Sequence, residues 1–234
     1  MTQRDRSIKQ PQWRAETYWF LAALYGEPIT GPALARLAGA AAKNQEEATG
    51  IGDEFRTALA EDAGCNFEEL SQRLASEHAR LFLGLRQGYG PPPPYESMWR
   101  EARVLGDSTL AVATAYSEAG FEDAGQCGPC DHIASELRFL ASLCHAEAEA
   151  AAKGETGEAA WARERQINFV DEHLLRWVPQ YCQELARQSR ESLYAALARV
   201  TGKVVAGDAL TMGAARVAAK QASSDIRWQE GVAA

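Results

Sequence analysis

Apolar residues recur along this chain at intervals of three and four positions, the spacing that places side chains on one face of an α-helix. In the first such stretch, over residues 13–25, the spacing selects Trp13, Phe20, Leu21 and Leu24 as the buried face. A glycine and a proline follow within a few positions and predict that the helix ends there. The chain is therefore expected to begin with an amphipathic helix.

The same periodicity predicts further helices, and local signals refine two of them. Asn66 is a favourable N-cap, and Glu69 stands three residues later, as in a capping box. Pro179 lies inside a long helical pattern and is expected to kink or split that helix, because proline lacks the backbone donor. The additional helices are expected over residues 32–48, 53–61, 67–85, 97–119, 131–153, 158–185 and 189–204.

Three segments interrupt or weaken the helical pattern. Residues 88–94 contain two glycines and then four prolines, which fix an extended, polyproline-like rod. Residues 120–129 are rich in glycine and form the natural boundary if the helices divide into two lobes. Beyond Gly207 the pattern weakens, and residues 212–234 are interpreted as a mobile tail or a loosely docked helix.

Composition places the chain in the all-α class. Val and Ile together number about fifteen, too few β-branched residues to fill a large sheet. We expect a single bundle-like domain of about eight to ten helices over residues 1–211. If this domain has two lobes, they cover residues 12–119 and 129–205 and are joined by a hinge near residues 120–129.

Charge and hydropathy narrow the functional classes. The formal net charge is −8, and an acidic chain is repelled by a phosphate backbone, which argues against nucleic-acid binding. No stretch reaches the roughly 20 apolar residues of a membrane span, and residues 1–10 lack the apolar run of a signal peptide. These features predict a cytoplasmic protein whose five cysteines are reduced thiols.

One motif invites an enzymatic interpretation, because Cys127 and Cys130 are separated by Gly-Pro as in thioredoxin-like redox sites. That chemistry requires a preceding strand, and only helices and a glycine-rich loop are predicted upstream. With His132 the pair offers three zinc ligands, whereas a structural zinc site needs four. The simplest interpretation is a helix start in which glycine and proline set the turn. No phosphate loop, nucleophile elbow or His-Glu-x-x-His motif is present, so no catalytic residue, cofactor or metal site is predicted.

Two other clusters carry candidate surface chemistry. His132 and Glu136 are one helical turn apart, with Asp131 at the expected helix start, and alone they favour a structural cap. Around the proline run lies an apolar and aromatic set that is expected to be exposed. It serves either as a groove for a peptide or as a lid on the core. This set comprises Leu81, Phe82, Leu85, Tyr89, Tyr95, Met98 and Trp99.

Two motifs in these clusters resemble the signatures of the TorD/DmsD/NarJ chaperone family. Residues 79–82, Ala-Arg-Leu-Phe, and residues 93–99, Pro-Pro-Tyr-Glu-Ser-Met-Trp, are similar to the first signature. Residues 129–139, Pro-Cys-Asp-His-Ile-Ala-Ser-Glu-Leu-Arg-Phe, are similar to the second. A weaker likeness covers residues 169–179, and the resemblance as a whole extends over about residues 13–205.

The resemblance implies an all-helical, cytoplasmic chaperone, not an enzyme, for molybdenum-cofactor enzymes of the dimethyl sulfoxide reductase superfamily. Such a protein binds the twin-arginine signal peptide, the apo catalytic subunit, or both, and assists cofactor insertion and assembly before export. It is a monomer or a domain-swapped homodimer. A thiol-disulfide oxidoreductase that uses the cysteine pair is the alternative. By position, the implied peptide groove consists of Leu81, Phe82, Pro94, Tyr95, Ser97 and Trp99, with a polar wall of Asp131, His132 and Glu136.

The implied site suits a twin-arginine peptide, which has a cationic pair followed by an apolar stretch. Carboxylates accept guanidinium donors in a fork, and an aromatic groove accommodates the apolar part. Two departures from the family pattern, His78 in place of an aromatic residue and a longer spacer before the prolines, leave the client enzyme open. The sequence also leaves open signal-peptide versus mature-surface recognition, the oligomeric state, nucleotide binding and the role of the cysteine pair.

Overall fold

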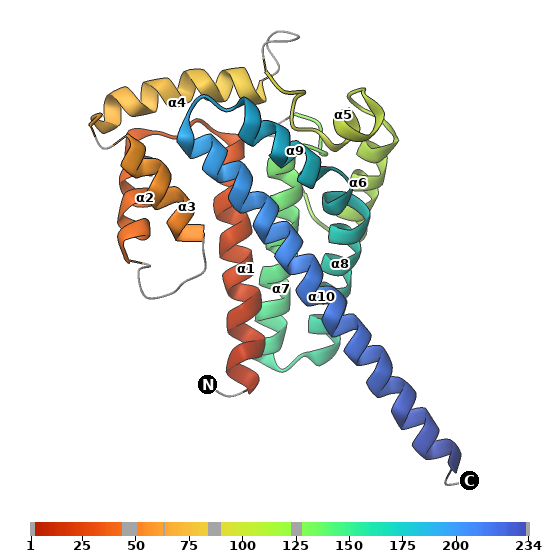
Figure 1. Cartoon of the computed structure of the whole chain (residues 1–234). Coiled ribbons are helices and arrows are strands. Elements are labelled where there is room, and N and C mark those ends of the chain that lie inside the picture. Colours follow the sequence, from red (N-terminus) through yellow and green to blue (C-terminus); the bar gives the residue numbers. More distant parts are fainter. Residues whose placement is uncertain (1–2, 44–50, 63, 84–89, 123–127, 233–234) are drawn as a thin grey trace.

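Helices joined by loops make up the described part of the chain, as the computed structural model shows (Figure 1). Within it, the one strand-like pairing is an isolated bridge between Tyr95 and His132. The all-α prediction is therefore confirmed. None of the described helices combines the length and apolar character needed to cross a membrane. The structure describes residues 3–43, 51–62, 64–83, 90–122 and 128–232.

Two long helices, α1 and α7, lie side by side at the centre of the fold, and α10 runs obliquely across them (Figure 1). Helices α2 and α3 pack together on one side, while α5, α6 and α8 lie on the other. Helix α9 lies along the first part of α10. The elements are α1 (Gln3–Gly26), α2 (Gly31–Lys43), α3 (Ile51–Glu61), α4 (Phe67–Phe82), α5 (Glu96–Glu101), α6 (Asp107–Glu118), α7 (Ile133–Lys153), α8 (Thr156–Phe169), the π-turn η1 (Val170–Leu174), α9 (Leu175–Gln188) and α10 (Ser192–Val232).

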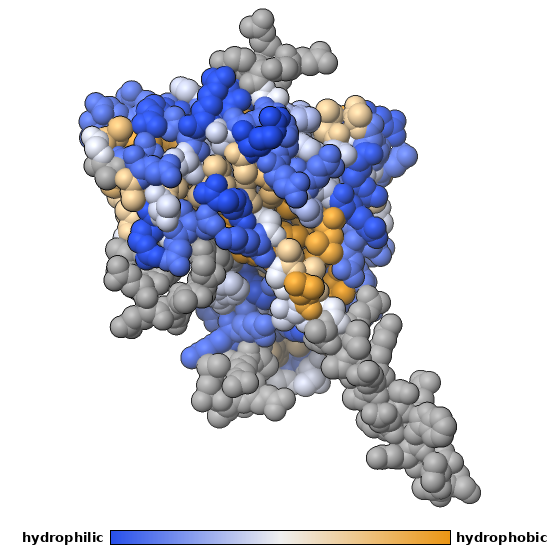
Figure 2. Space-filling model, in the orientation of Figure 1, coloured by the Kyte–Doolittle hydropathy of each residue, from blue (hydrophilic) through white to orange (hydrophobic). Residues whose placement is uncertain are grey.

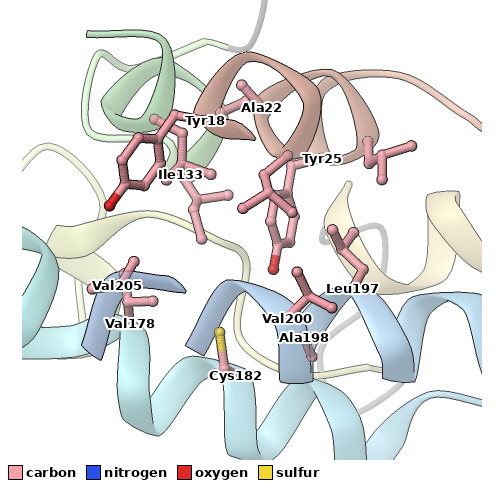
Figure 3. Packing of buried hydrophobic residues seen from close by; sticks show 14 of the residues in the cluster. Tyr18, Ala22, Tyr25, Ile133, Val178, Cys182, Leu197, Ala198, Val200 and Val205 are labelled. Carbon is pink, nitrogen blue, oxygen red and sulfur yellow. The ribbon is translucent and has the colours of Figure 1, made fainter. Parts of the chain in front are cut away.

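One hydrophobic core joins the helices of the two predicted lobes. Figure 3 shows Tyr18 and Tyr25 of α1 together with Ile133 of α7, with side chains of α9 and α10 on the other side of the cluster. Each of these three side chains is buried, which stabilises the fold by about 1.5–3 kcal/mol per large apolar side chain. The hinge expected near residues 120–129 falls partly outside the described residues, and the two-lobe arrangement stays a prediction.

The buried face of α1 matches the predicted one only in part, since Leu21 and Leu24 are buried as expected. Trp13 and Phe20, expected in the core, are 42% and 37% exposed. The buried face of this helix instead includes Ala15, Tyr18 and Ala22, and α1 packs along α7. Small side chains allow two helices to approach closely, and a periodicity search that weighs large apolar residues passes over them. The assignment of Trp13 and Phe20 to the core is therefore wrong.

A buried polar network fixes α10 to α1. Arg14 Nε donates to Asp208 Oδ2 at 2.7 Å, and the Tyr18 hydroxyl donates to the same oxygen at 2.6 Å. Asp208, which accepts both bonds, lies beyond residue 204, where the last helix was expected to end. Helix α10 continues to Val232 without a break, so the segment interpreted as a tail begins within a continuous helix.

The long helix expected after the proline run is divided into α5 and α6. The chain turns where Ala102 and Leu105 adopt left-handed backbone conformations, with φ of 57° and 60°, which cost an L-residue about 1–2 kcal/mol each. The carboxylate of Glu101 then caps α6, accepting the backbone N–H groups of Asp107 and Ser108 at 2.8 Å each. The single helix predicted over this region is therefore wrong.

Helices α8 and α9 follow one another through the π-turn η1 without an intervening loop. In this turn the N–H of Leu175 bonds to the carbonyl of Val170, five residues back rather than four. Pro179 lies inside α9, about one turn later, and the helix is not split there. The change of hydrogen-bond register thus precedes the proline that was expected to cause a break.

Candidate functional site

The two motifs predicted to form one site pair with each other through their backbones. The N–H of Glu96 donates to the carbonyl of Asp131, and the N–H of Ile133 donates to the carbonyl of Pro94, both at 2.9 Å. Segments that lie about 35 residues apart in sequence are thereby fixed side by side. We call this region the joint, and it comprises residues 94–97 and 131–136 together with His173 and Trp177.

Two side chains of the joint act as helix caps. Asp131 Oδ2 accepts the backbone N–H of Ser97 at 2.9 Å, so Asp131 caps α5 rather than the helix that it precedes. His132 Nδ1 accepts the N–H of Ala134 at 3.1 Å and caps α7, while its ring lies edge-on to Tyr95. Burial lowers the pKa of His132 to about 3, so its ring is neutral and able to accept this bond.

Glu96 is the ionic centre of the joint. Its Oε2 lies 2.9 Å from Nδ1 of His173, and its Oε1 accepts a short hydrogen bond from Arg100. The Glu96 side chain is fully buried, whereas Arg100 is partly exposed. Sequence reasoning left Glu96 and His173 outside the predicted site. The weaker likeness over residues 169–179, which contains His173, was the available signal.

Glu136 lies deeper in the joint, where its Oε2 accepts the indole N–H of Trp177 at 3.2 Å. Burial raises the pKa of Glu136 well above its ordinary value, and the nearby charge of Glu96 raises it further. Both causes favour the protonated, neutral form of the Glu136 carboxyl group. Because Glu136 and Asp131 are both fully buried, neither carboxyl group is open to a guanidinium from solvent in this arrangement.

Leu81 and Phe82, predicted to line an exposed groove, belong to the core. They are 0% and 3% exposed, and the Phe82 ring lies edge-on to Tyr25 and Tyr194 at centroid distances of 5.6 and 5.4 Å. The exposed position expected for this pair is therefore wrong. Leu85 and Tyr89, from the same predicted set, lie outside the described residues.

Trp99 keeps part of its ring exposed while its polar edge is occupied. The indole N–H donates to the carbonyl of Pro93 at 3.2 Å, and the ring packs edge-on against buried Tyr181 at 5.4 Å. Of the nine residues predicted to bind a peptide, Tyr95 and Trp99 alone are not buried. The peptide-binding role of the nine residues stays a prediction.

A surface hollow of about 380 Å³ lies beside Trp99. One part of its wall comes from the proline-rich segment that precedes the joint and from α5, and the other part comes from α9 (Figure 1). Figure 2 shows hydrophilic side chains over α9 on this face. We call this feature the hollow, and its lining residues are Pro92, Trp99, Gln180, Gln183, Glu184 and Arg187.

The cysteines give little support to the alternative redox reading. Cys127 lies outside the described residues, and the partly buried Cys130 thiol lies 3.4 Å from the carbonyl of Thr109. Burial raises the pKa of Cys144 and of Cys182 to about 12, which keeps both as neutral thiols. In the described part of the chain, no three His, Cys, Asp or Glu side chains are grouped as metal ligands.

A family model described as the nitrate reductase delta subunit matches residues 42–183, well over half of the chain. The matched segment contains both signature motifs and the whole of the joint. The chain therefore belongs to this family, the TorD/DmsD/NarJ family that the motifs resemble.

The chain is similar to individual proteins as well. The chain is 26% identical to the chaperone protein TorD of Vibrio cholerae serotype O1 over 196 residues, which cover 80% of this chain and 86% of that protein. It is 35% identical to the selenate reductase assembly chaperone protein of Thauera selenatis over 75 residues, 32% of this chain and 37% of that one. A crystal structure of an Archaeoglobus fulgidus protein assigned to redox enzyme maturation aligns over 81% of this chain and 91% of that one, with 21% identity and a TM-score of 0.48.

Proposed function

We propose that this protein is a cytoplasmic chaperone for a molybdenum-cofactor oxidoreductase of the dimethyl sulfoxide reductase superfamily. It binds the twin-arginine signal peptide of the catalytic subunit, the apo subunit itself, or both, and assists cofactor insertion and assembly before export. The proposal gives the chain no catalytic role. It acts as a monomer or as a domain-swapped homodimer.

The observation that carries the proposal is the pairing of the two signature motifs in the joint. Backbone bonds from Glu96 to Asp131 and from Ile133 to Pro94 bring both motifs to one place. Motifs that were separate in sequence thus belong to one structural unit, as a shared binding site requires. Family membership supports the same function, as do the relatives, a chaperone protein TorD and a selenate reductase assembly chaperone protein.

Within this proposal, the nine predicted residues divide into two roles. Tyr95 and Trp99 keep exposed surface and supply the contact with the client. Asp131, His132 and Pro94 hold these aromatic side chains in place through the caps and the backbone pairing. If the arginine pair of a leader reaches Asp131, the segment that contains α5 has to separate from the start of α7 first.

The alternative function, thiol-disulfide exchange by Cys127 and Cys130, is not favoured. It requires an activated thiolate, which is typically produced at the N-terminus of a helix after a strand. The segment before Cys130 contains no strand in the described part of the chain. An insulin-reduction assay with a Cys127→Ser control is expected to show no thiol-dependent turnover.

The proposal is tested by isothermal titration calorimetry with two probes. One is the twin-arginine leader of a molybdenum-enzyme catalytic subunit from the same genome, and the other is the apo subunit. We expect saturable binding of at least one probe. Trp99→Ala should weaken it by about 30-fold, the effect of losing one aromatic hot spot worth about 2 kcal/mol.

Circular dichroism of Trp99→Ala is the control for folding, and Trp161→Ala is the matched control, because Trp161 is exposed on α8 and outside the hollow. Absence of binding to both the leader and the apo subunit by the unmodified protein contradicts the proposed function.

A further inference from the structure

The exposed surface next to the joint differs from the site that the sequence predicts. The predicted polar wall, Asp131, His132 and Glu136, is buried and already committed to helix caps and to Trp177. Among the residues of the signature that reach the surface, Trp99 is the one that lines the hollow. A client that touches Trp99 therefore meets α9 on the other side, not the acidic residues of the signature.

Trp99 offers a rigid and purely apolar contact. Its indole N–H is already donated to Pro93, and its ring is supported by the fully buried Tyr181. Because the one polar atom of Trp99 is occupied, its remaining exposed surface favours an apolar side chain. Pro92 extends the same wall with another apolar ring. A fixed aromatic wall loses little conformational entropy when a ligand packs against it.

The opposite wall offers side chains that can form hydrogen bonds with the main chain of a peptide. Gln180 and Gln183 are exposed and lie about one turn apart on α9, and their side chains have no hydrogen-bond partner among the described residues. A carboxamide carries both a donor and an acceptor, which match the C=O and N–H groups of an extended peptide. The two glutamines therefore suit a peptide backbone better than they suit a charged group.

The charges at the rim of the hollow neutralise each other. Glu184 Oε1 and Oε2 accept bonds from Arg187 Nη2 and Nε at 2.6 and 2.9 Å, and Oε1 also accepts from Gln188. These bonds, first those from Arg187, lower the pKa of Glu184 to about 2. A guanidinium that entered the hollow would have to displace Arg187 from Glu184. The balance of charge therefore favours an uncharged occupant.

We propose that the hollow between Trp99 and α9 receives an uncharged, extended segment of the client, with an aliphatic side chain against Trp99 and its backbone bonded to Gln180 and Gln183. This inference rests on the proposed chaperone function and adds the position and the chemistry of the contact. In a twin-arginine leader, the segment of this character is the apolar stretch after the arginine pair. A volume of about 380 Å³ is at the small end for ligand pockets and accommodates a short stretch of peptide.

The test measures fluorescence anisotropy of two fluorescein-labelled peptides. The first is the leader used for calorimetry, and the second is the same leader with its apolar stretch replaced by serines. The test variant is Gln180→Ala/Gln183→Ala. The matched control is Gln12→Ala/Gln72→Ala, which removes two exposed glutamines of α1 and α4 that do not line the hollow.

We expect the α9 double variant to bind the apolar leader about tenfold more weakly than the unmodified protein, the loss of two hydrogen bonds. The control variant should stay within about twofold of the unmodified protein. The serine-substituted leader should bind weakly to every form and should be insensitive to the α9 change.

Equal binding of the apolar leader by the α9 variant and the control overturns the inference and leaves the proposed function standing. The inference is also overturned if the α9 change weakens both peptides by the same factor, since the apolar stretch is then not the occupant. If the unmodified protein binds neither the leader nor the apo subunit, the proposed function fails and the inference fails with it.

Discussion

The joint and the hollow lie next to each other, share the proline-rich signature segment, and differ in almost every physical respect. The joint is mostly buried, contains several carboxyl groups and is completed by backbone pairing between Glu96 and Asp131 and between Pro94 and Ile133. The hollow is open, nearly neutral in charge, and bordered by side chains of α9 that have ordinary surface composition.

This difference shows that residues recognisable from sequence motifs can be buried, while residues accessible to a partner can lack any motif. Asp131 and His132 are conspicuous in the sequence, and the structure uses both as helix caps. Gln180 and Gln183 carry no sequence signal, and yet they are exposed beside Trp99. A motif can therefore mark a region of the structure while the side chains proposed to contact a partner lie on a neighbouring helix.

The largest expected effect concerns the ionic centre of the joint. Glu96→Ala leaves His173 buried without its carboxylate and removes the ion-pair partner of Arg100. Breaking a buried pair in this way should lower the free energy of unfolding by about 3–5 kcal/mol. Urea denaturation followed by tryptophan fluorescence measures the change.

The matched control for this substitution is Arg103→Ala, which removes an exposed ion pair with Glu101 and should cost less than about 1 kcal/mol. Comparable small losses in both variants would mean that the buried ion pair of the joint contributes no more to the free energy of unfolding than a surface ion pair.

A smaller effect is expected from the pH dependence of stability. Because the folded state favours the protonated form of Glu136, its stability is full below the ordinary carboxyl pKa of 4.5 and falls as the pH rises toward the elevated pKa. The fall is up to about 1.4 kcal/mol per pH unit. Glu136→Gln cannot release this proton, so its stability relative to the unmodified protein should increase with pH.

Urea denaturation of both proteins between about pH 5 and 8 measures this trend, because it spans the range above the ordinary carboxyl pKa. The proton that His132 takes up on unfolding is common to both proteins and cancels in their difference. Parallel pH profiles for the two proteins would show that folding does not raise the pKa of Glu136.

The smallest expected effect on stability belongs to the hollow. Gln180→Ala/Gln183→Ala should change the free energy of unfolding by no more than about 0.5 kcal/mol, because exposed side chains without partners contribute little to folding. The same variant is expected to weaken client binding about tenfold. A loss of stability above about 1 kcal/mol would show that the two glutamines have a structural role, like the residues of the joint.

Local signals predicted the local features well. Asn66 caps α4 through the expected bond, with its Oδ1 accepting the N–H of Glu69 at 2.9 Å. The all-α class followed from the shortage of β-branched residues, and the assembly of the two motifs followed from their resemblance to family signatures. Each of these features depends on a few residues that are close in sequence or that share a known pattern.

Features that depend on three-dimensional neighbours could not be predicted in the same way. The break after α5 requires Glu101 to fold back onto the start of α6, and no periodicity encodes that bond. The extension of α10 past residue 204 is held by Arg14 and Tyr18, almost two hundred residues earlier. The α9 wall of the hollow is defined by its position opposite Trp99, which no local sequence pattern encodes.

The π-turn between α8 and α9 has a consequence for how the surface beside Trp99 can change. Each residue rotates a helix by about 100°, so a widened turn changes the angular phase of everything that follows it. The π-helical segment Val170–Leu174 therefore sets the rotation of α9 about its axis, and with it which α9 side chains face Trp99. Removing one residue from that turn would bring a different set of α9 side chains next to Trp99 without any substitution within α9 itself.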